Sequence, residues 1–185
     1  DHRDLHSFPT RRSSDLTDYP SDNQPVAVQS LLQTIKNDAQ ALSGQRGQQI
    51  TLEADPSILL KGSEGELRSA FSNLVFNAVK YTQDKGNIRI RWWADEHGAH
   101  LSVQDSGIGI DAKHLPRLTE RFYRVDSSRN SNTGGTGLGL AIVKHVLLRH
   151  RARLEISSVL GHGSTFTCHF PPTQVARSRV LSPDE

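Results

Sequence analysis

Four glycines crowd into residues 134–139 of the segment GGTGLGLAIVK, directly before an apolar run. Glycine lets backbone N–H groups approach an anion closely, and the N-terminus of a following helix adds partial positive charge. The segment therefore predicts a phosphate cradle, and the alternative is an ordinary loop that ends in a helix. It does not match a P-loop, because Leu140 stands where lysine should follow Gly134 and Gly139.

A second group of polar residues lies on a helix predicted over 64–81. Four of them share one stripe at spacings i, i+4, i+7 and i+8: Asn73, Asn77, Lys80 and Tyr81. The neighbouring stripe is apolar: Leu67, Ala70, Phe71, Leu74 and Ala78. An asparagine carbonyl can bind Mg²⁺, a lysine can meet a phosphate and a tyrosine ring can cover a base. The polar stripe thus predicts a ligand wall, and a solvated helix face is the alternative.

Asp105 ends a predicted strand and stands just before Gly107 and Gly109. A carboxylate there can accept a hydrogen bond from an exocyclic amine such as that of adenine, and the glycines would let the base approach the backbone. An Asp-Ser-Gly turn is the plain alternative. A dinucleotide fingerprint, G-x-G-x-x-A ending at Ala112, is a weaker one, because Pro116 shortens the helix that it needs and the preceding strand pairs in a hairpin.

These residues need a scaffold, and the hydrophobic patterns predict one. Helices are predicted over 27–42, 64–81 and 137–150. Ser63 and Glu66 form a possible capping box for the second helix. Strands are predicted over 48–54 and 57–62 and in two hairpins, 87–94 with 99–105 and 153–159 with 164–170. A turn at 107–109 leads to a short helical piece, and a glycine- and asparagine-rich loop covers 127–136. This grouping favours an antiparallel or mixed sheet covered by helices on one face.

The composition narrows the function classes. The chain has 185 residues and a net charge of +2, a balance that argues against binding to nucleic acid. The single cysteine, Cys168, excludes an intramolecular disulfide and suits a reducing compartment. The longest mostly apolar run, 138–148, is too short to span a bilayer, and no signal-peptide region is apparent, so we expect a soluble, cytoplasmic domain. We predict a disordered or non-native segment over 1–25, one domain over 26–172 and a polar tail over 173–185.

Five short motifs follow one another along the predicted domain. They are NLVFNAVKYT from residue 73, DSGIGI from 105, ERFYRVD from 120, GGTGLGLAIVK from 134 and GHGSTF from 161. In this order they resemble the N box, first glycine box, F box, second glycine box and last glycine box of the ATP-binding catalytic domain of sensor histidine kinases. The resemblance implies the Bergerat fold, an α+β two-layer sandwich with a mixed, mostly antiparallel sheet covered by helices on one face. Segments 72–82 and 116–129 are most similar to the phosphate-regulon branch of these kinases.

The resemblance implies a role for each matching position, with ATP and Mg²⁺ as cofactors. Asn77 would ligate Mg²⁺ with Asn73 nearby, while Lys80 and Arg124 would contact the phosphates; these four form the predicted catalytic set. Around the adenine, Tyr81 would flank the ring and Asp105 would take the amine. The rest of that pocket would be Gly107, Gly109 and Thr165. A lid would bring N–H groups to the phosphates through Gly135, Thr136, Gly137, Leu138 and Gly139.

The kinases that these motifs resemble carry their acceptor histidine in a His-Glu-x-x-x-Pro-like segment, and no such segment occurs here. The resemblance therefore implies transfer of the ATP γ-phosphoryl group to a histidine on a separate dimerisation hairpin of a parent kinase. That parent would serve a response regulator and would be a membrane-anchored homodimer in the bacterial inner membrane. Four of the remaining histidines lack metal-ligand spacing and are expected on the surface: His97, His100, His145 and His150.

An ATP-hydrolysing clamp of the same fold is the alternative function. Such ATPases resemble one another in having E-x-x-x-N at the N box, where the glutamate is the general base for water. Asn73 occupies that position here, and an amide cannot take the proton. A scaffold that only binds nucleotide is a third possibility, and the complete set of Asn77, Lys80, Asp105 and Arg124 argues against it.

Overall fold

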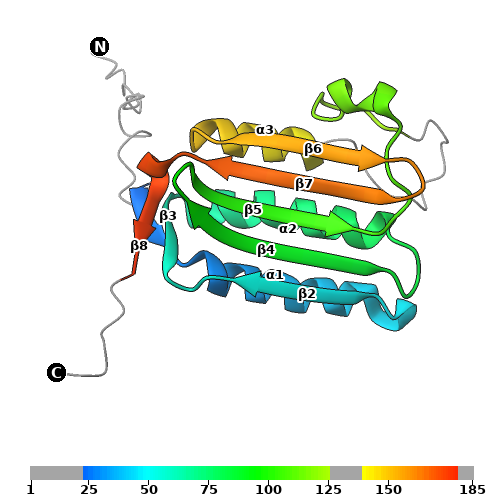
Figure 1. Ribbon diagram of the computed structural model, residues 1–185, viewed down its shortest axis with the longest axis horizontal. Helices are drawn as coiled ribbons and strands as arrows, with labels where there is room; N and C mark the ends of the chain where they lie inside the picture. Colours follow the sequence, from blue (N-terminus) through cyan, green and yellow to red (C-terminus); the bar gives the residue numbers. More distant parts are fainter. Residues whose placement is uncertain (1–22, 126–138, 179–185) are drawn as a thin grey trace, which may run out of the picture.

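The computed structural model describes residues 23–125 and 139–178, which form two layers. One layer is a five-stranded sheet in the order β2-β4-β5-β7-β6. Figure 1 shows the helices α1, α2 and α3 against one face of this sheet, and none of the described helices covers the other face, which we call the open face. The strands are β2 Gln49–Ala54, β4 Asn87–Asp95, β5 Gly98–Asp105, β6 Arg153–Val159 and β7 Gly163–Phe170, and the helices are α1 Val28–Ser43, α2 Glu64–Tyr81 and α3 Gly139–Arg149. The predicted α+β class is confirmed.

The pairing within the sheet is mixed and mostly antiparallel. Only β2 runs parallel to its neighbour, β4, while β4, β5, β7 and β6 pair antiparallel in turn. Side chains alternate between the two faces of a strand. In β5, Leu101 and Val103 are buried against the helices, so Asp105 at the end of the strand lies on the same face. Both predicted hairpins are therefore confirmed, and the first places Asp105 on the helix side of the sheet.

The core lies between the sheet and the helices, and aromatic rings hold its centre. Phe71 of α2 meets Phe170 of β7 edge to face, with 6.1 Å between ring centroids. Phe170 makes a second edge contact with Trp92 of β4 at 6.2 Å. All three side chains are almost completely buried, and the Trp92 indole N–H donates to the Ile58 carbonyl at 3.1 Å. The apolar stripe predicted for α2 therefore packs as expected.

A small second sheet differs from the sequence prediction. Strand β3, Ile58–Gly62, forms as predicted, but it pairs with β1, Gln24–Val26, and β8, Val175–Arg177, rather than with the large sheet. Both partner strands extend past the limits predicted for the domain. The residues of β8 are predicted to belong to a tail, and they instead form part of the folded domain. Three-residue strands such as Gln-Pro-Val and Val-Ala-Arg are too short to show a usable alternation, so the sequence does not reveal their pairing with β3. The predicted loop 127–136 lies outside the described residues.

Helix α2 begins at the capping residue that the sequence predicts. The Ser63 hydroxyl accepts a hydrogen bond from the Glu66 N–H at 3.4 Å. In a full capping box the Glu66 side chain would return to the Ser63 N–H. Here His150 Nε2 accepts that N–H instead, at 3.1 Å, and Glu66 pairs with Arg149 at 2.8 Å. The start of α2 is thus tied to the end of α3.

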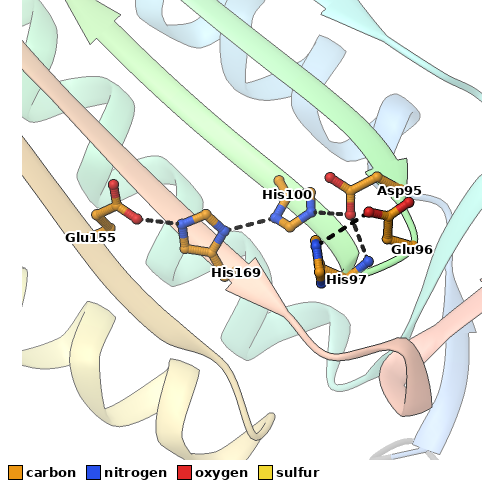
Figure 2. Close-up of polar contacts among 6 residues, drawn as sticks. All are labelled: Asp95, Glu96, His97, His100, Glu155 and His169. Atoms are coloured by element: carbon orange, nitrogen blue, oxygen red, sulfur yellow. Dashed lines mark hydrogen bonds and ion pairs between the residues drawn. The ribbon is translucent and has the colours of Figure 1, made fainter.

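The histidines divide into exposed and buried ones. His97 and His145 are exposed as expected, but His100 and His150 are each only 5% exposed, so the surface prediction is wrong for these two. Figure 2 shows why for His100, which lies in a chain of hydrogen bonds across the open face of the sheet. Its ring contacts Asp95 at 2.8 Å and His169 Nδ1 at 2.7 Å, and His169 contacts Glu155 at 2.9 Å. Cross-strand pairing brings these residues together, which spacing along one strand does not reveal.

Candidate nucleotide-binding site

The polar stripe of α2 lies at the edge of the core. Asn73, Asn77 and Lys80 are half-buried, and Tyr81 is 44% exposed. The Lys80 ammonium lies 5.2 Å from the centroid of the Tyr81 ring. Burial lowers the pKa of Lys80, and the nearby Arg124 guanidinium lowers it further. A half-buried lysine and an exposed arginine near enough to lower its pKa suit a polyanion such as a triphosphate.

Asp105 lies on the helix side at the C-terminal end of β5 and is 9% exposed. Its Oδ1 accepts the Gly107 N–H at 2.9 Å. Burial raises the pKa of Asp105, while backbone hydrogen bonds from Gly107 and Ser164 partly offset the rise. The carboxylate is therefore fixed in orientation and largely removed from water, and it still has acceptor capacity for a ligand amine.

The glycines that follow Asp105 permit close contacts between backbones. A methyl group on Gly107 would lie 2.3 Å from the Tyr81 carbonyl oxygen. Gly109 has a φ of +69°, and a methyl group there would lie 2.1 Å from the Val159 carbonyl oxygen. The Ile108 N–H donates to the Tyr81 carbonyl at 3.3 Å. The first glycine box is therefore joined directly to the last turn of α2, as the prediction of a shared pocket requires.

Thr165 is not where the sequence analysis expects it. It pairs with Gln104 in the sheet, whereas Asp105 pairs with Ser164. Because faces alternate, Thr165 lies on the open face with Gln104, and Ser164 lies on the helix side with Asp105. Ser164 is 6% exposed, and its hydroxyl contacts Ser158 Oγ at 2.8 Å. The alternation of Phe166, Cys168 and Phe170 toward the core could have identified Ser164 from the sequence.

The second glycine box is described only from Gly139, the first residue of α3. Gly139 lies against Asn73, since a methyl group on it would approach Asn73 Oδ1 within 3.0 Å. The Asn73 amide N–H donates to the Ser69 carbonyl at 2.7 Å, which turns its oxygen toward α3. The other predicted lid residues lie outside the described ranges: Gly135, Thr136, Gly137 and Leu138.

The donor set fits Mg²⁺ through amide oxygen rather than through a carboxylate cage. No group of three or more His, Cys, Asp or Glu in the described residues could hold a metal ion. Mg²⁺ commonly uses one or two protein oxygens and completes its shell with water and substrate phosphates. Asn77 is half-buried on α2 about one turn before Lys80, and its side-chain amide oxygen is compatible with that arrangement.

This geometry matches a known family. A family described as histidine kinase-, DNA gyrase B- and HSP90-like ATPases matches residues 62–174. The chain belongs to this family, and it is an ATP-binding catalytic domain of the sensor histidine kinase kind. It is 77% identical over 167 residues to the phosphate regulon sensor protein PhoR of Pseudomonas aeruginosa, which covers 90% of this chain and 38% of that protein. It is 50% identical over 116 residues to the PhoR of Haemophilus influenzae, covering 63% of this chain and 27% of that protein.

Solved structures agree with the fold. The mycobacterial sensor histidine kinase MprB superposes with a TM-score of 0.70 at 25% identity, covering 80% of this chain and 97% of that one. Full-length ShkA, solved in complex with AMPPNP, gives a TM-score of 0.73 at 27% identity, covering 85% of this chain and 32% of that one. The chain thus spans well under half the length of the curated relatives named above. No helix within 23–125 or 139–178 has the length and apolarity to cross a membrane.

Proposed function

We propose that this domain transfers the γ-phosphoryl group of ATP, in the presence of Mg²⁺, to a histidine on a dimerisation hairpin elsewhere in its parent protein. The observation that carries the proposal is the last turn of α2, where two chemistries meet. Lys80 and the nearby Arg124 offer positive charge for phosphates, and the Tyr81 carbonyl is joined to the loop that begins at the buried Asp105. To bind ATP, a site needs positive charge for the triphosphate and a hydrogen-bond acceptor for the adenine amine, and this turn brings the two together.

The chemical work of the domain is positioning and charge neutralisation. A neutral histidine is already a nucleophile, so its ring nitrogen attacks the γ-phosphorus while the bond to the β-phosphate oxygen breaks. Asn77 would hold Mg²⁺, which supplies charge neutralisation on the phosphate oxygens when bound. Lys80 and Arg124 would hold the phosphates in line, and Asp105 would fix the base through the adenine amine.

Hydrolysis of ATP as the main activity is disfavoured by Asn73. A hydrolase needs a base that accepts a proton from water. The Asn73 side-chain amide donates to the Ser69 carbonyl and lies against Gly139, where α2 meets α3. This uncharged amide cannot serve as the base. The domain is therefore expected to release phosphate slowly when no acceptor is present.

A groove beside α3 supports docking of the acceptor hairpin. It has a volume of about 510 Å³ and lies between α3, β6 and the short helix η4, Ala112–Arg117. Its apolar lining includes Leu115, Leu147, Leu148 and Ile156. Leu148 is 64% exposed at this groove, so its side chain is available to an apolar partner surface. Leu148→Arg should lower hairpin phosphorylation and leave ATP binding intact. Leu42→Arg is the matched control, because Leu42 is 60% exposed on α1.

The test is radiolabelled ATP with this chain alone and then with a separate dimeric hairpin from a related sensor kinase. We expect acid-labile label on the hairpin, as phosphohistidine requires, and none on the chain. Asn77→Ala should abolish the labelling. Rapid phosphate release by the chain alone, lost in Asn77→Ala, would instead favour the clamp-type ATPase.

The relatives support a proposal for the setting of the parent. At 77% identity to a phosphate regulon sensor protein, the domain is proposed to act in phosphate-regulon signalling through a response regulator. The parent is proposed to be a membrane-anchored homodimer of the bacterial inner membrane, with this domain in the cytoplasm. Expression of the parent in a strain that lacks its phosphate sensor, followed by a phosphate-starvation reporter, tests this assignment.

A further inference from the structure

The C-terminal end of α2 lacks the glycine that often closes a helix. Its C-cap is Thr82 in an extended conformation, with φ −97° and ψ 135°. The last carbonyls of a helix have no partner within the helix and must find one elsewhere. Two side chains from a distant segment, Arg46 and Gln48, bind the carbonyls of Val79 and Thr82. We call these two side chains the α2 clamp.

Arg46 ends the short helix η3, Gly44–Arg46, and its guanidinium makes three contacts. One Nη donates to the Val79 carbonyl at 2.7 Å, the other donates to the Thr82 carbonyl, and Nε pairs with Asp84 at 2.9 Å. A positive charge at this place also complements the negative end of the helix dipole. The Arg46 guanidinium therefore grips the helix end and the residues just beyond it.

Gln48 supplies the buried half of the clamp. It is only 3% exposed, and its Nε2 donates to the Val79 carbonyl at 2.9 Å and to the Thr82 carbonyl at 2.8 Å. Its own Oε1 is buried without a hydrogen-bond partner among the described residues. A side chain that keeps an unpaired buried oxygen gains little stability from its place. Its two donated bonds therefore indicate a role in fixing the position of the α2 end rather than in overall stability.

The clamped turn is the one that carries the nucleotide-binding side chains. Tyr81 lies between the clamped carbonyls of Val79 and Thr82, and its own carbonyl accepts the Ile108 N–H at 3.3 Å. Gly107 packs on that same carbonyl and donates to Asp105. The clamp and the first glycine box thus hold one turn of helix from two separate segments of the chain.

We propose that Arg46 and Gln48 are positioning residues for the nucleotide, which hold Tyr81 and Lys80 at the separation from Asp105 that an adenine nucleotide requires. This inference rests on the proposed ATP site. Neither clamp residue is expected to touch ATP. They act by fixing the last turn of α2. If this turn frayed, Lys80 and Tyr81 would adopt many positions and would contact the phosphates and the base less often in the productive geometry.

Gln48→Met is the sharpest variant, since it keeps volume, removes both donated bonds and also removes the unpaired oxygen. We expect it to stay folded and to weaken AMPPNP binding about three- to tenfold, the equivalent of one net hydrogen bond. Trp92→Phe is the matched control, because it also removes one buried N–H bond to a carbonyl, that of Ile58, and Trp92 pairs with Leu101 in the sheet rather than with Asp105. Arg46→Met should act like Gln48→Met, and Arg46→Lys should recover part of the affinity.

The measurements are AMPPNP affinity by calorimetry, at a temperature where circular dichroism shows each variant folded, and the KM and kcat for ATP with an acceptor hairpin. A positioning role raises KM with kcat kept, whereas a purely structural role lowers the active fraction and therefore kcat with KM kept. Unchanged affinity in folded Gln48→Met, or an equal loss in Trp92→Phe, would overturn the proposal. Absence of AMPPNP binding by the unaltered chain would refute the ATP site itself, which separates the two failures.

Discussion

Replacing Asp105 by asparagine changes the chemistry of the site while preserving its shape. The amide oxygen can still accept the Gly107 N–H, which the carboxylate accepts at 2.9 Å. The amide nitrogen then points to where the adenine amine is proposed to bind, so that two donors face each other. A hydrogen bond to a charged group contributes about 1.5–3 kcal/mol, so AMPPNP affinity should fall roughly tenfold to 150-fold. The assay is isothermal titration calorimetry of the variant and the unaltered chain.

The same carboxylate should select the base. Guanine carries a carbonyl oxygen where adenine carries its amine, and this oxygen would face Asp105 with no proton between them. GTP should therefore compete weakly for the unaltered chain and more evenly for Asp105→Asn. Gln104→Ala is the control, because Gln104 is exposed and lies on the open face of the sheet.

Burial also links Asp105 to stability. Because burial raises its pKa in the folded chain, the folded state holds this proton more tightly than the unfolded state does. Its contribution to the free energy of unfolding is therefore most favourable at low pH and falls as pH rises from the ordinary aspartate range through the raised pKa. At pH 7 the ionised group costs stability, so Asp105→Asn should melt at a temperature equal to or above that of the unaltered chain. Affinity for AMPPNP should show the opposite trend and weaken as pH falls through the same window.

Two results would refute this reasoning. The first is AMPPNP affinity in Asp105→Asn within twofold of the unaltered chain, since the proposed contact would then contribute nothing. The second is a clear drop in melting temperature in Asp105→Asn at pH 7, since the charge would then stabilise the fold rather than the complex.

Three further predictions concern the scaffold. Ser63→Ala should lower the free energy of unfolding by about 1 kcal/mol, because it removes the hydroxyl that caps α2; urea denaturation measures this, and Ser63→Asp should restore it. Phe71→Ala should cost about 3–5 kcal/mol, because it empties the space against Phe170, and an ordinary melting curve would contradict the assigned core. Burial raises the pKa of Cys168 to about 12, so the native thiol should resist an aromatic disulfide reagent at pH 8 and react fully in guanidinium.

Much of the nucleotide site could be predicted because its signals are local. The polar stripe of α2 and its apolar neighbour depend only on helical spacing, and the helix runs over Glu64–Tyr81 as predicted. Asp105 and Gly107 stand two residues apart at a strand end, so the turn that joins them is also a local feature. Motif order along the chain then links these segments to one family.

The features that could not be predicted depend on pairing between distant segments. Ser164, not Thr165, shares a face with Asp105 because the register between β5 and β7 places it there. Strands β1 and β8 exist because β3 offers them an edge. The α2 clamp joins side chains of one segment to backbone carbonyls of another. Every residue has a backbone carbonyl, so the sequence does not show which carbonyls accept these bonds.

Helix α2 is held at both ends by side chains from opposite parts of the chain, and this explains how distant segments act on one site. At its start, His150 Nε2 accepts the Ser63 N–H, while His150 Nδ1 must carry a proton to donate to the Val146 carbonyl at 2.8 Å. Both ring nitrogens are therefore used in the neutral form, which fixes the end of α3 to the start of α2. The start of α3 in turn lies against Asn73 through Gly139. Since α3 contacts α2 at both of its own ends, Gly139 of the second glycine box has a defined position relative to Asn73, and a displacement of one helix alone would disrupt both contacts.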